Sequence, residues 1–361
     1  MTPSDRIPYR RLFPWLHLFR AIGIALSFRQ LVVAAGAIGV LSLGQTLVEW
    51  VAPDVPAAVI NVEPKIGPEP GPFAQLRELT TETRRPWEDI LRPSVAALAN
   101  GETLAGRLKS VGCLGWVIAV WSLFGLVLCR LAARRFARNE DGSLRKAILF
   151  GPTRWIHAIV APLLPSVAAL LIMVLAVLAI LPSRLSWVGP TLALMASPVV
   201  LLCGLVAAYL MIAVLLGWPL MVAAIATDDC DGFGSLSRSY SLWTGRPWHF
   251  VWCWISVACA GAVAMIVANW LMQSTLQLSG LAIHLALGET PAMASAVTGA
   301  QFLAAFALKV YGISFFWTSA TIVYALLRQS VDGMPLDNMA PDDDERPNRD
   351  PLPVVGMPAM R

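Results

Sequence analysis

A run of 41 residues without a charged side chain, 185–225, constrains the fold of this chain more than any other feature. A helix of that length is about 60 Å long, because each residue adds about 1.5 Å, and a bilayer's hydrocarbon core is only about 30 Å thick. The run therefore holds either two membrane spans or one span plus a short interfacial or re-entrant piece. Pro190, Pro198 and Pro219 are the positions where a helix would break or bend.

The overall composition points to the same class of protein. Hydrophobic residues make up 57% of the chain and charged residues only 14%, whereas a soluble domain carries about 25% charged residues. Helices that are apolar on every side can be buried only in a membrane or in the core of a very large protein. The sequence thus predicts an all-α polytopic membrane bundle.

Six stretches are long and apolar enough to cross a bilayer: 31–48, 111–131, 156–181, 192–216, 250–272 and 302–327. This assignment gives 185–225 one span. With six spans, the short segments rich in Lys and Arg all fall on one side, whereas a seventh span would place the basic C-terminal tail opposite the N-terminus. Basic loops stay in the cytoplasm. We therefore expect an integral protein of the cell's inner membrane with both termini cytoplasmic.

This topology divides the chain into three regions. Residues 1–30 predict an N-terminal amphipathic interfacial helix, with a helix packed against the protein as the alternative. Residues 31–331 form the six-span domain, which includes an outer loop at 52–110 with short helices at 75–88 and 94–109. Residues 332–361 are rich in Pro and polar side chains and predict a disordered cytoplasmic tail.

The stretch from Trp218 to Trp248 reads as a membrane-surface element between two spans. The residues that give it this character are apolar, helix-capping, basic or aromatic: Trp218, Pro219, Asp231, Gly232, Leu236, Arg238, Ser239, Tyr240, Arg246 and Trp248. The acidic turn 228–231 lacks the ligand spacing of an EF-hand loop, and we expect a solvated turn that caps the next helix. The loop at 141–155 has a similar order of residues, which raises the possibility of duplicated hairpins.

The same stretch resembles the membrane domain attached to some bacterial glycerophosphoryl diester phosphodiesterases, and stand-alone six-span proteins related to it. The shared elements are an apolar Trp218-Pro219, an acidic-Gly turn, a Leu-x-x-Ser helix at Leu236 and a re-entry at Trp248. The likeness covers about 30 residues closely and 111–327 only by span layout. In that family the phosphodiesterase activity belongs to a separate soluble domain, for which this chain has no room. The resemblance therefore implies a bacterial six-span fold and no catalytic role.

Lys309 is the one Lys or Arg residue placed well inside a predicted span, away from its ends. Ionisable groups at such depth are rare and often functional. Its long side chain can reach the outer interface, and the alternative is a pair with Glu49 or Glu289 as structure or as part of a polar pathway. These three residues are the predicted candidate polar site.

No other pattern in the sequence predicts chemistry. None of the six cysteines lies in the outer loop, so no disulfide framework is expected. His157, His249 and His284 lack partners at metal-ligand spacing, and neither a P-loop nor a G-x-S-x-G elbow occurs. We expect no cofactor, no metal, no enzyme activity and no nucleic-acid binding.

Two functions fit these expectations best. The first is a non-catalytic scaffold, assembly partner or lipid-organising protein, because surface helices are predicted and intramembrane charge is scarce. The second is a transporter or channel for a lipid-like or small apolar solute, which the Pro- and Gly-broken fourth span and Lys309 favour. Membrane lipids are the expected partners, with a protein partner possible through the loop 52–110 or the C-terminal tail.

Overall fold

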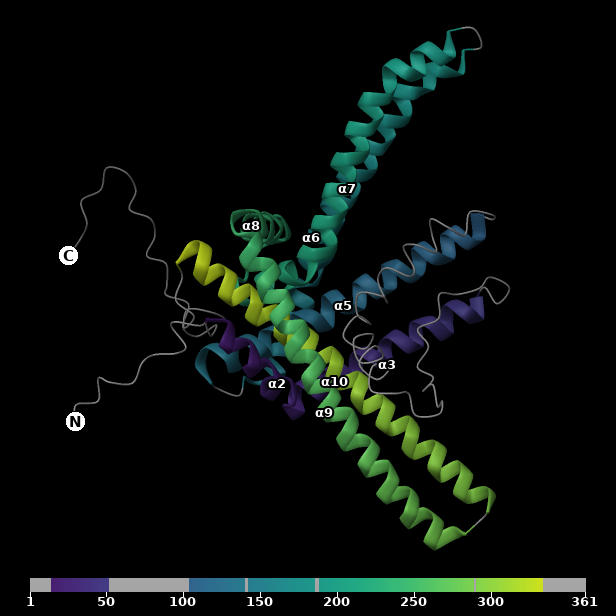
Figure 1. Ribbon diagram of the computed structural model, residues 1–361, viewed down its shortest axis with the longest axis vertical. Coiled ribbons are helices and arrows are strands. Elements are labelled where there is room, and N and C mark those ends of the chain that lie inside the picture. Colours follow the sequence, from purple (N-terminus) through teal and green to yellow (C-terminus); the bar gives the residue numbers. More distant parts are fainter. Residues whose placement is uncertain (1–13, 52–103, 140–141, 186–187, 289, 334–361) are drawn as a thin grey trace, which may run out of the picture.

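The computed structural model describes residues 14–51, 104–139, 142–185, 188–288 and 290–333. Within these ranges every regular element is a helix, and no strand occurs (Figure 1). In chain order they are η1 (Pro14–Phe19), α2 (Arg20–Ala25), α3 (Phe28–Val51), α5 (Leu104–Arg138), α6 (Leu144–Ile180), η2 (Leu181–Arg184), α7 (Gly189–Asp228), α8 (Gly232–Gly245), α9 (Pro247–Leu287) and α10 (Pro291–Asp332).

Six of these helices are long and apolar enough to cross a membrane: α3, α5, α6, α7, α9 and α10. The all-α polytopic fold and the six spans predicted from the sequence are confirmed, and the uncharged run 185–225 belongs from Gly189 onward to one helix, α7. The predicted spans were too short, since α6, α7, α9 and α10 have 37 to 42 residues each. A span assigned from bilayer thickness stops near 20 residues, but a helix continues for as long as its backbone is supported.

The helices meet in a buried centre, which we call the hub. Its core is the second half of α10, where every residue from Lys309 to Leu327 is buried, and the end of α7, where every residue from Gly217 to Thr227 is buried. Helices α2, α3, α5, α8 and α9 contact α10 around this core. Trp317 at its middle is fully buried, and its ring centroid lies 6.1 Å from that of Trp121 on α5 and 5.7 Å from that of Trp218 on α7.

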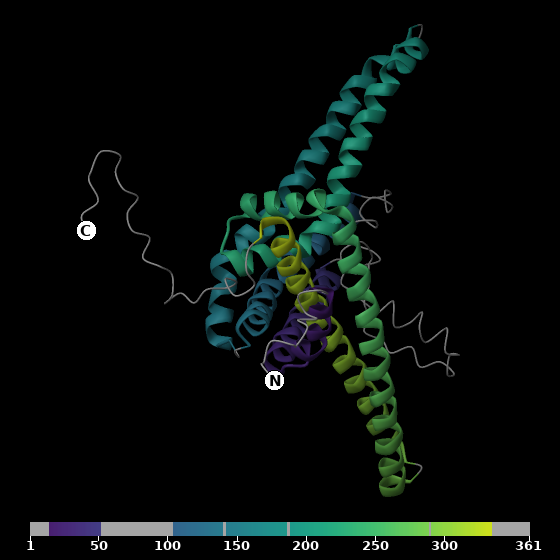
Figure 2. The same cartoon turned by 60° about the vertical axis from the view of Figure 1, so that its left-hand side comes forward.

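Away from the hub, the long helices separate as pairs. The α6/α7 pair and the α9/α10 pair leave the hub in different directions in both views, and α3 and α5 extend in a third (Figures 1 and 2). The outer parts of the pairs expose large apolar side chains, including Leu194 and Leu201 on α7 and Leu278 and Leu285 on α9. Each pair is therefore packed mainly within itself, and most of its surface faces outward.

Small residues allow α6 and α7 to lie close together. The buried residues of α6 along this contact include Ala161, Ala169 and Ala176, and those of α7 include Ala207 and Ala213. Alanine lets two helix backbones approach, so that van der Waals contact holds them together in an apolar solvent. The pair is therefore stable without help from the other helices over its outer half.

The described part of the N-terminal region consists of two short helices, η1 and α2, rather than one long one. Leu18, Ala21, Ile24 and Ala25 are buried, and α2 contacts α10 in the hub. This face matches the packed alternative given for residues 1–30. A sharp turn separates α2 from α3, and Arg29 at the start of α3 donates a hydrogen bond of 2.5 Å to the carbonyl of Gly142.

The two similar loops share a helix cap but lead into different arrangements of helices. Ser143 accepts a hydrogen bond from the backbone N–H of Lys146 at the start of α6, and Asp231 accepts one from Gly234 at the start of α8. Helix α6 then runs on without a break, whereas α8 ends at Gly245 and α9 begins at Pro247. Proline lacks the N–H needed inside a helix and is accommodated in a first turn, so the second connection keeps α8 as a separate element.

Some predicted elements lie outside the described residues. These are the helix at 75–88, most of the outer loop and the tail beyond residue 333. The predicted helix 94–109 is described only from Leu104, where it forms the start of α5 rather than a helix of its own.

Candidate functional site at the end of α7

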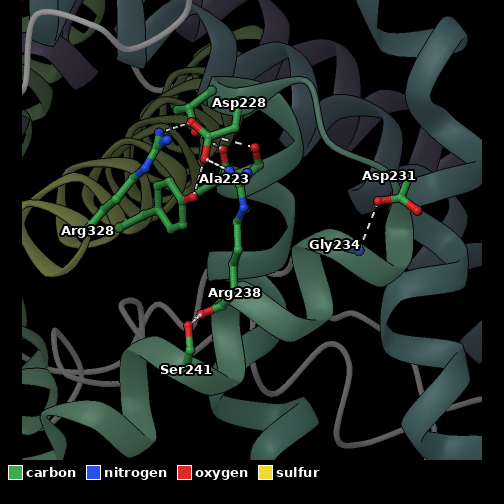
Figure 3. A network of polar contacts seen from close by, with 10 residues as sticks. Ala223, Asp228, Asp231, Gly234, Arg238, Ser241 and Arg328 are labelled. Atoms are coloured by element: carbon green, nitrogen blue, oxygen red, sulfur yellow. Dashed lines mark hydrogen bonds and ion pairs between the residues drawn. The ribbon is translucent and has the colours of Figure 1, made fainter. Parts of the chain in front are cut away.

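The end of α7 carries a buried carboxylate that joins three helices. The side chain of Asp228 is only 4% exposed, and it pairs with Arg238 of α8 and Arg328 of α10 (Figure 3). The hydroxyl of Tyr324, one turn before Arg328, donates a hydrogen bond of 2.5 Å to the same carboxylate. A buried ion needs such partners, because removing a charge from water costs several kcal/mol.

Two further arginines reach the same helix end. Arg130 of α5 is buried and donates a hydrogen bond of 2.8 Å to the carbonyl of Ala226, while its guanidinium lies 4.7 Å from the ring centroid of Phe150. Arg154 of α6 pairs with Asp229 at 2.7 Å. A helix C-terminus carries partial negative charge on its unpaired carbonyls. Arginines from α5, α6, α8 and α10 therefore all converge on the end of α7, and we call this arrangement the arginine node.

The electrostatics of the node fix the charge of its groups outside the membrane spans. Burial of Arg238 acts against its charge, but Asp228, Tyr324 and Cys230 together outweigh it, so the pKa of this guanidinium is raised above its ordinary value. Burial raises the pKa of the Cys230 thiol to about 11; Asp228 adds to this effect, and Arg238 opposes it. The arginine stays charged at physiological pH, and the thiol stays neutral and weakly nucleophilic.

The residues predicted for the surface motif divide into two groups. Trp218, Pro219, Gly232 and Ser239 lie inside the protein, as part of the hub or against it. The hydroxyl of Ser239 donates a hydrogen bond of 3.2 Å to the carbonyl of Gly217. These residues attach α8 to α7 and have no contact with solvent or lipid.

Gly232 is required by close packing. A Cβ atom at this position would lie 2.9 Å from the carbonyl oxygen of His157 on α6. The first turn of α8 therefore rests directly on the backbone of α6, with Asp231 as its N-cap.

The second group reaches the surface. Leu236 and Tyr240 are half-buried against the hub, while Arg246 and Trp248 are exposed, with 85% of Trp248 accessible. Phe233, at the start of α8, is 69% exposed. The motif thus combines buried attachment residues with an exposed set of basic and aromatic side chains.

The expectation of a solvated acidic turn is correct for Asp231 and wrong for Asp228. Asp231 is exposed and caps α8, but Asp228 is buried in the arginine node. The sequence offered one signal for this. Tyr324 and Arg328 are four residues apart, so they lie on one face of α10, and both reach Asp228. Arg130, Arg154 and Arg328 were interpreted only as topology signals, and nothing in the sequence shows that they converge.

Lys309 stands apart from the node, at the other end of the buried part of α10. It is 7% exposed. The side chains of Glu49 and Glu289 lie outside the described residues, so the pairing predicted for Lys309 stays a prediction.

A second buried polar cluster ties α3 to α10. The Gln30 side-chain oxygen accepts hydrogen bonds from Ser314 at 2.9 Å and from Thr318 at 2.6 Å, and Ser314 also donates to the carbonyl of Ala25. Polar side chains of this kind hold membrane helices together. The cluster fixes the entry of α3 into the hub.

Within the described ranges, no group of three or more His, Cys, Asp or Glu side chains is placed to hold a metal ion. The arginine node offers guanidinium donors and paired carboxylates. Such an arrangement can bind an anion or clamp helix ends.

No protein-family model matches the chain, and neither does a curated protein or a solved structure. The resemblance to the phosphodiesterase-associated membrane domain accordingly stays a prediction. The fold itself defines the class: an all-α integral membrane protein with six candidate spans. Its distinguishing feature is a buried hub in which arginines of four helices meet the end of a fifth.

Proposed function

We propose that this protein is a non-catalytic inner-membrane scaffold that organises the lipid around it. The observation that carries the proposal is the divergence of the long helix pairs from one hub (Figures 1 and 2). At about 1.5 Å per residue, α7 and α9 are about 60 Å long, twice the hydrocarbon thickness of a bilayer. Helices this long and apolar must tilt strongly to stay in the membrane.

Strong tilt in different directions has a consequence for lipid. The outer parts of the pairs expose apolar side chains, such as Leu201 of α7 and Trp270 of α9, so acyl chains would surround the pairs and fill the space between them. Lipids held between diverging helices cannot pack as in a flat bilayer. The fold would therefore thin or bend the membrane locally, while the buried hub keeps the pairs at fixed directions.

The distribution of charge supports an orientation with the hub at the cytoplasmic side. The described ends of the spans at the hub carry Arg130, Arg154, Arg246 and Arg328, whereas the far end of the α6/α7 pair carries only Arg184. Cytoplasmic segments are enriched in Lys and Arg. Both termini would then be cytoplasmic. A reporter enzyme fused after residue 361 checks this, since alkaline phosphatase would be inactive there and active after a fusion at Leu185.

The scaffold proposal is tested by measuring the separation of the outer ends. Spin labels are attached at Leu185→Cys and Thr290→Cys in a chain whose six native cysteines are replaced, and the protein is placed in lipid nanodiscs. Diverging pairs predict a separation above about 40 Å, given the helix rise of about 1.5 Å per residue. Upright neighbouring pairs predict about 10–25 Å, one or two helix diameters.

Bilayer thickness sharpens the test. Thinner bilayers should increase the tilt and lengthen the distance between the two labels. Two labels at the outer end of the same α6/α7 pair, at Leu185 and Leu194, serve as the control. The distance between them should not change with bilayer thickness. A short distance that ignores bilayer thickness would replace the proposal with an upright bundle.

Transport of a lipid-like or small apolar solute is the second candidate, and the burial of Lys309 favours it. A buried ammonium in a membrane helix commonly marks a substrate or ion pathway. The test is to identify by mass spectrometry the lipids and solutes that co-purify with the protein. A defined compound lost on Lys309→Met, at unchanged thermal stability, would establish this function and displace the scaffold proposal.

A further inference from the structure

Exposed arginine and aromatic side chains occur on α8 and on the neighbouring ends of α6 and α9, and we call this set the α8 face. It consists of Arg154, Phe233, Arg238, Arg246 and Trp248. The side chains of Arg154 and Arg238 are 30% and 43% exposed, and Arg246 is exposed. We propose that the α8 face binds the headgroups of anionic phospholipids in the leaflet on the hub side, a proposal that rests on the scaffold function.

The arginines are held together by adjacent residues of one turn. Arg154 pairs with Asp229, and Arg238 pairs with Asp228, as Figure 3 shows for the second pair. Their guanidinium groups therefore approach the same helix end from α6 and from α8. Arginine has five N–H donors in a planar fork, and the contacts of Arg154 with Asp229 and of Arg238 with Asp228 and Tyr324 use only part of them. The exposed parts of these side chains can therefore donate to a phosphate oxygen without breaking the existing pairs.

The charge at the node is unbalanced in favour of anions. Arg130, Arg154, Arg238 and Arg328 surround a helix end that carries two carboxylates, Asp228 and Asp229. Arg246 adds a further positive charge at the far end of α8, while Asp231 at its near end caps the helix. The surplus of positive charge is partly exposed, and an anionic headgroup complements it.

The side chains next to the α8 face place it at the boundary of the membrane. Val251 and Trp252 follow Trp248 within about one turn and are 44% and 52% exposed, so they lie on the same face of α9 as Trp248. On α9 the surface thus changes from Arg246 and Trp248 to apolar side chains over about one turn. That is the position of the headgroup layer, where Arg and Trp side chains are commonly found.

The exposed rings of Phe233 and Trp248 then have a physical role. An aromatic ring at this depth inserts at the level of the headgroups and the upper acyl chains, beside the guanidinium groups. A soluble nucleic acid would gain nothing from an apolar neighbour such as Val251. The pattern therefore fits a phospholipid that supplies both a phosphate and an acyl chain.

The test uses the full chain reconstituted in phosphatidylcholine vesicles that contain a trace of spin-labelled phosphatidylglycerol or spin-labelled phosphatidylcholine. Electron paramagnetic resonance separates lipid at the protein surface from bulk lipid and gives the preference for the anionic headgroup. We expect a clear preference for phosphatidylglycerol. Arg154→Gln combined with Arg246→Gln should reduce it, because each basic residue near an anionic lipid surface contributes about a fivefold effect.

A matched control is Arg184→Gln, an exposed arginine at the far end of the α6/α7 pair, which should leave the preference unchanged. Folding of each variant is checked by its thermal transition, and Trp248→Ala in the native background gives a second variant outside the ion pairs. An unchanged preference in both the double variant and Trp248→Ala would overturn the proposal.

A free phosphate site is distinguished by adding soluble inorganic phosphate, with sulfate as the control for ionic strength. Persistence of the lipid preference in phosphate supports headgroup binding. Its selective loss in phosphate would overturn the lipid proposal and identify a site for a soluble anion. The separation of the outer ends is measured independently, so failure of headgroup binding and failure of the scaffold function give different results.

Discussion

Two stretches from candidate membrane spans have opposite surroundings in this protein. From Lys309 to Leu327 of α10 every residue is buried, whereas the first part of α7, 189–216, exposes most of its large side chains. Among the six candidate spans, α7 is the most hydrophobic and α10 the least. The least hydrophobic span is therefore the one most deeply buried inside the protein, and the most hydrophobic span is the one most exposed.

The difference lies in the kind of residue each stretch contains. The buried stretch of α10 includes Gly312, Ser314, Thr318, Ser319 and Thr321. Small and polar side chains pack closely and form hydrogen bonds between membrane helices. The outer part of α7 is mostly Leu, Val, Met and Ala, side chains for which lipid is as good a neighbour as protein. Loss of a side chain should thus be costly in the hub and nearly neutral in the outer parts.

The largest expected effect is at the centre of the arginine node. Asp228→Ala leaves two arginines without their shared partner, and breaking a buried ion pair in this way costs about 3–5 kcal/mol. Detergent titration of the purified protein, followed by far-UV circular dichroism, measures the loss of stability.

The matched control for Asp228 is Asp332→Ala, an exposed carboxylate in the last turn of α10, which should change stability by less than about 0.5 kcal/mol. Adding Arg328→Met to Asp228→Ala should recover part of the loss, because it removes one unpaired charge. Equal stability of the Asp228 and Asp332 variants would show that the node is not a structural clamp.

The tryptophan at the middle of the hub gives the next comparison. Trp317→Ala removes a fully buried ring that packs against Trp121, Trp218 and Phe316, and such deletions cost about 3–5 kcal/mol in protein cores. Trp270→Ala on the outer part of α9, where the ring is 69% exposed, should cost less than about 1 kcal/mol. Thermal unfolding in detergent compares the two variants, and similar losses would mean that the outer helices are buried in a partner.

These contrasts show how far the sequence could predict the structure. The helical class and the six spans follow from uncharged runs such as 185–225, because an unsatisfied backbone is too costly in lipid and only helices or closed barrels satisfy it. The Asp231 cap could also be predicted, because a helix start is decided by its neighbours in sequence. The packing of Trp218 against Trp317 could not, since these residues are far apart in the sequence.

The arginine node marks the same limit. Asp228 and Arg238 are close in sequence, but Arg130 lies about 100 residues before Asp228, in α5, and Arg328 lies 100 residues after it, in α10. Arginines are common at the cytoplasmic ends of membrane spans. The presence of an arginine there therefore does not indicate a specific partner. Arg328 pairs with Asp228, whereas Arg184 lies in η2 at the outer end of the α6/α7 pair. The two arginines can be told apart only in the folded structure, where the ends of α7 and α10 are in contact.

Glycine-to-alanine substitutions give a smaller difference in stability between the hub and the outer parts of the helices. Gly232→Ala would place a Cβ 2.9 Å from the carbonyl oxygen of His157, and such overpacking costs about 1–3 kcal/mol. Gly204→Ala, on the outer part of α7, meets nothing within 4 Å and should be neutral or stabilising by up to about 1 kcal/mol. The thermal transitions of the two variants should therefore shift in opposite directions or differ clearly, and equal shifts would contradict the close contact of α8 with α6.

The smallest expected effect is on the reactivity of Cys230, which lies between α7 and α8 and tests whether water is excluded from the end of α7. The pKa of Cys230 is raised to about 11, mainly by burial, so its thiolate is scarce at neutral pH. In a chain with Cys230 as the sole cysteine, the rate of alkylation by iodoacetamide should keep rising about tenfold per pH unit up to about pH 10, because the thiolate is the nucleophile. A cysteine at the exposed position Ser237→Cys, with Cys230 replaced, should approach its plateau above about pH 9, near the ordinary thiol pKa of about 8.5. Slow access alone would lower the rate at Cys230 without moving the pH profile, so coinciding profiles would show that water reaches the end of α7 freely.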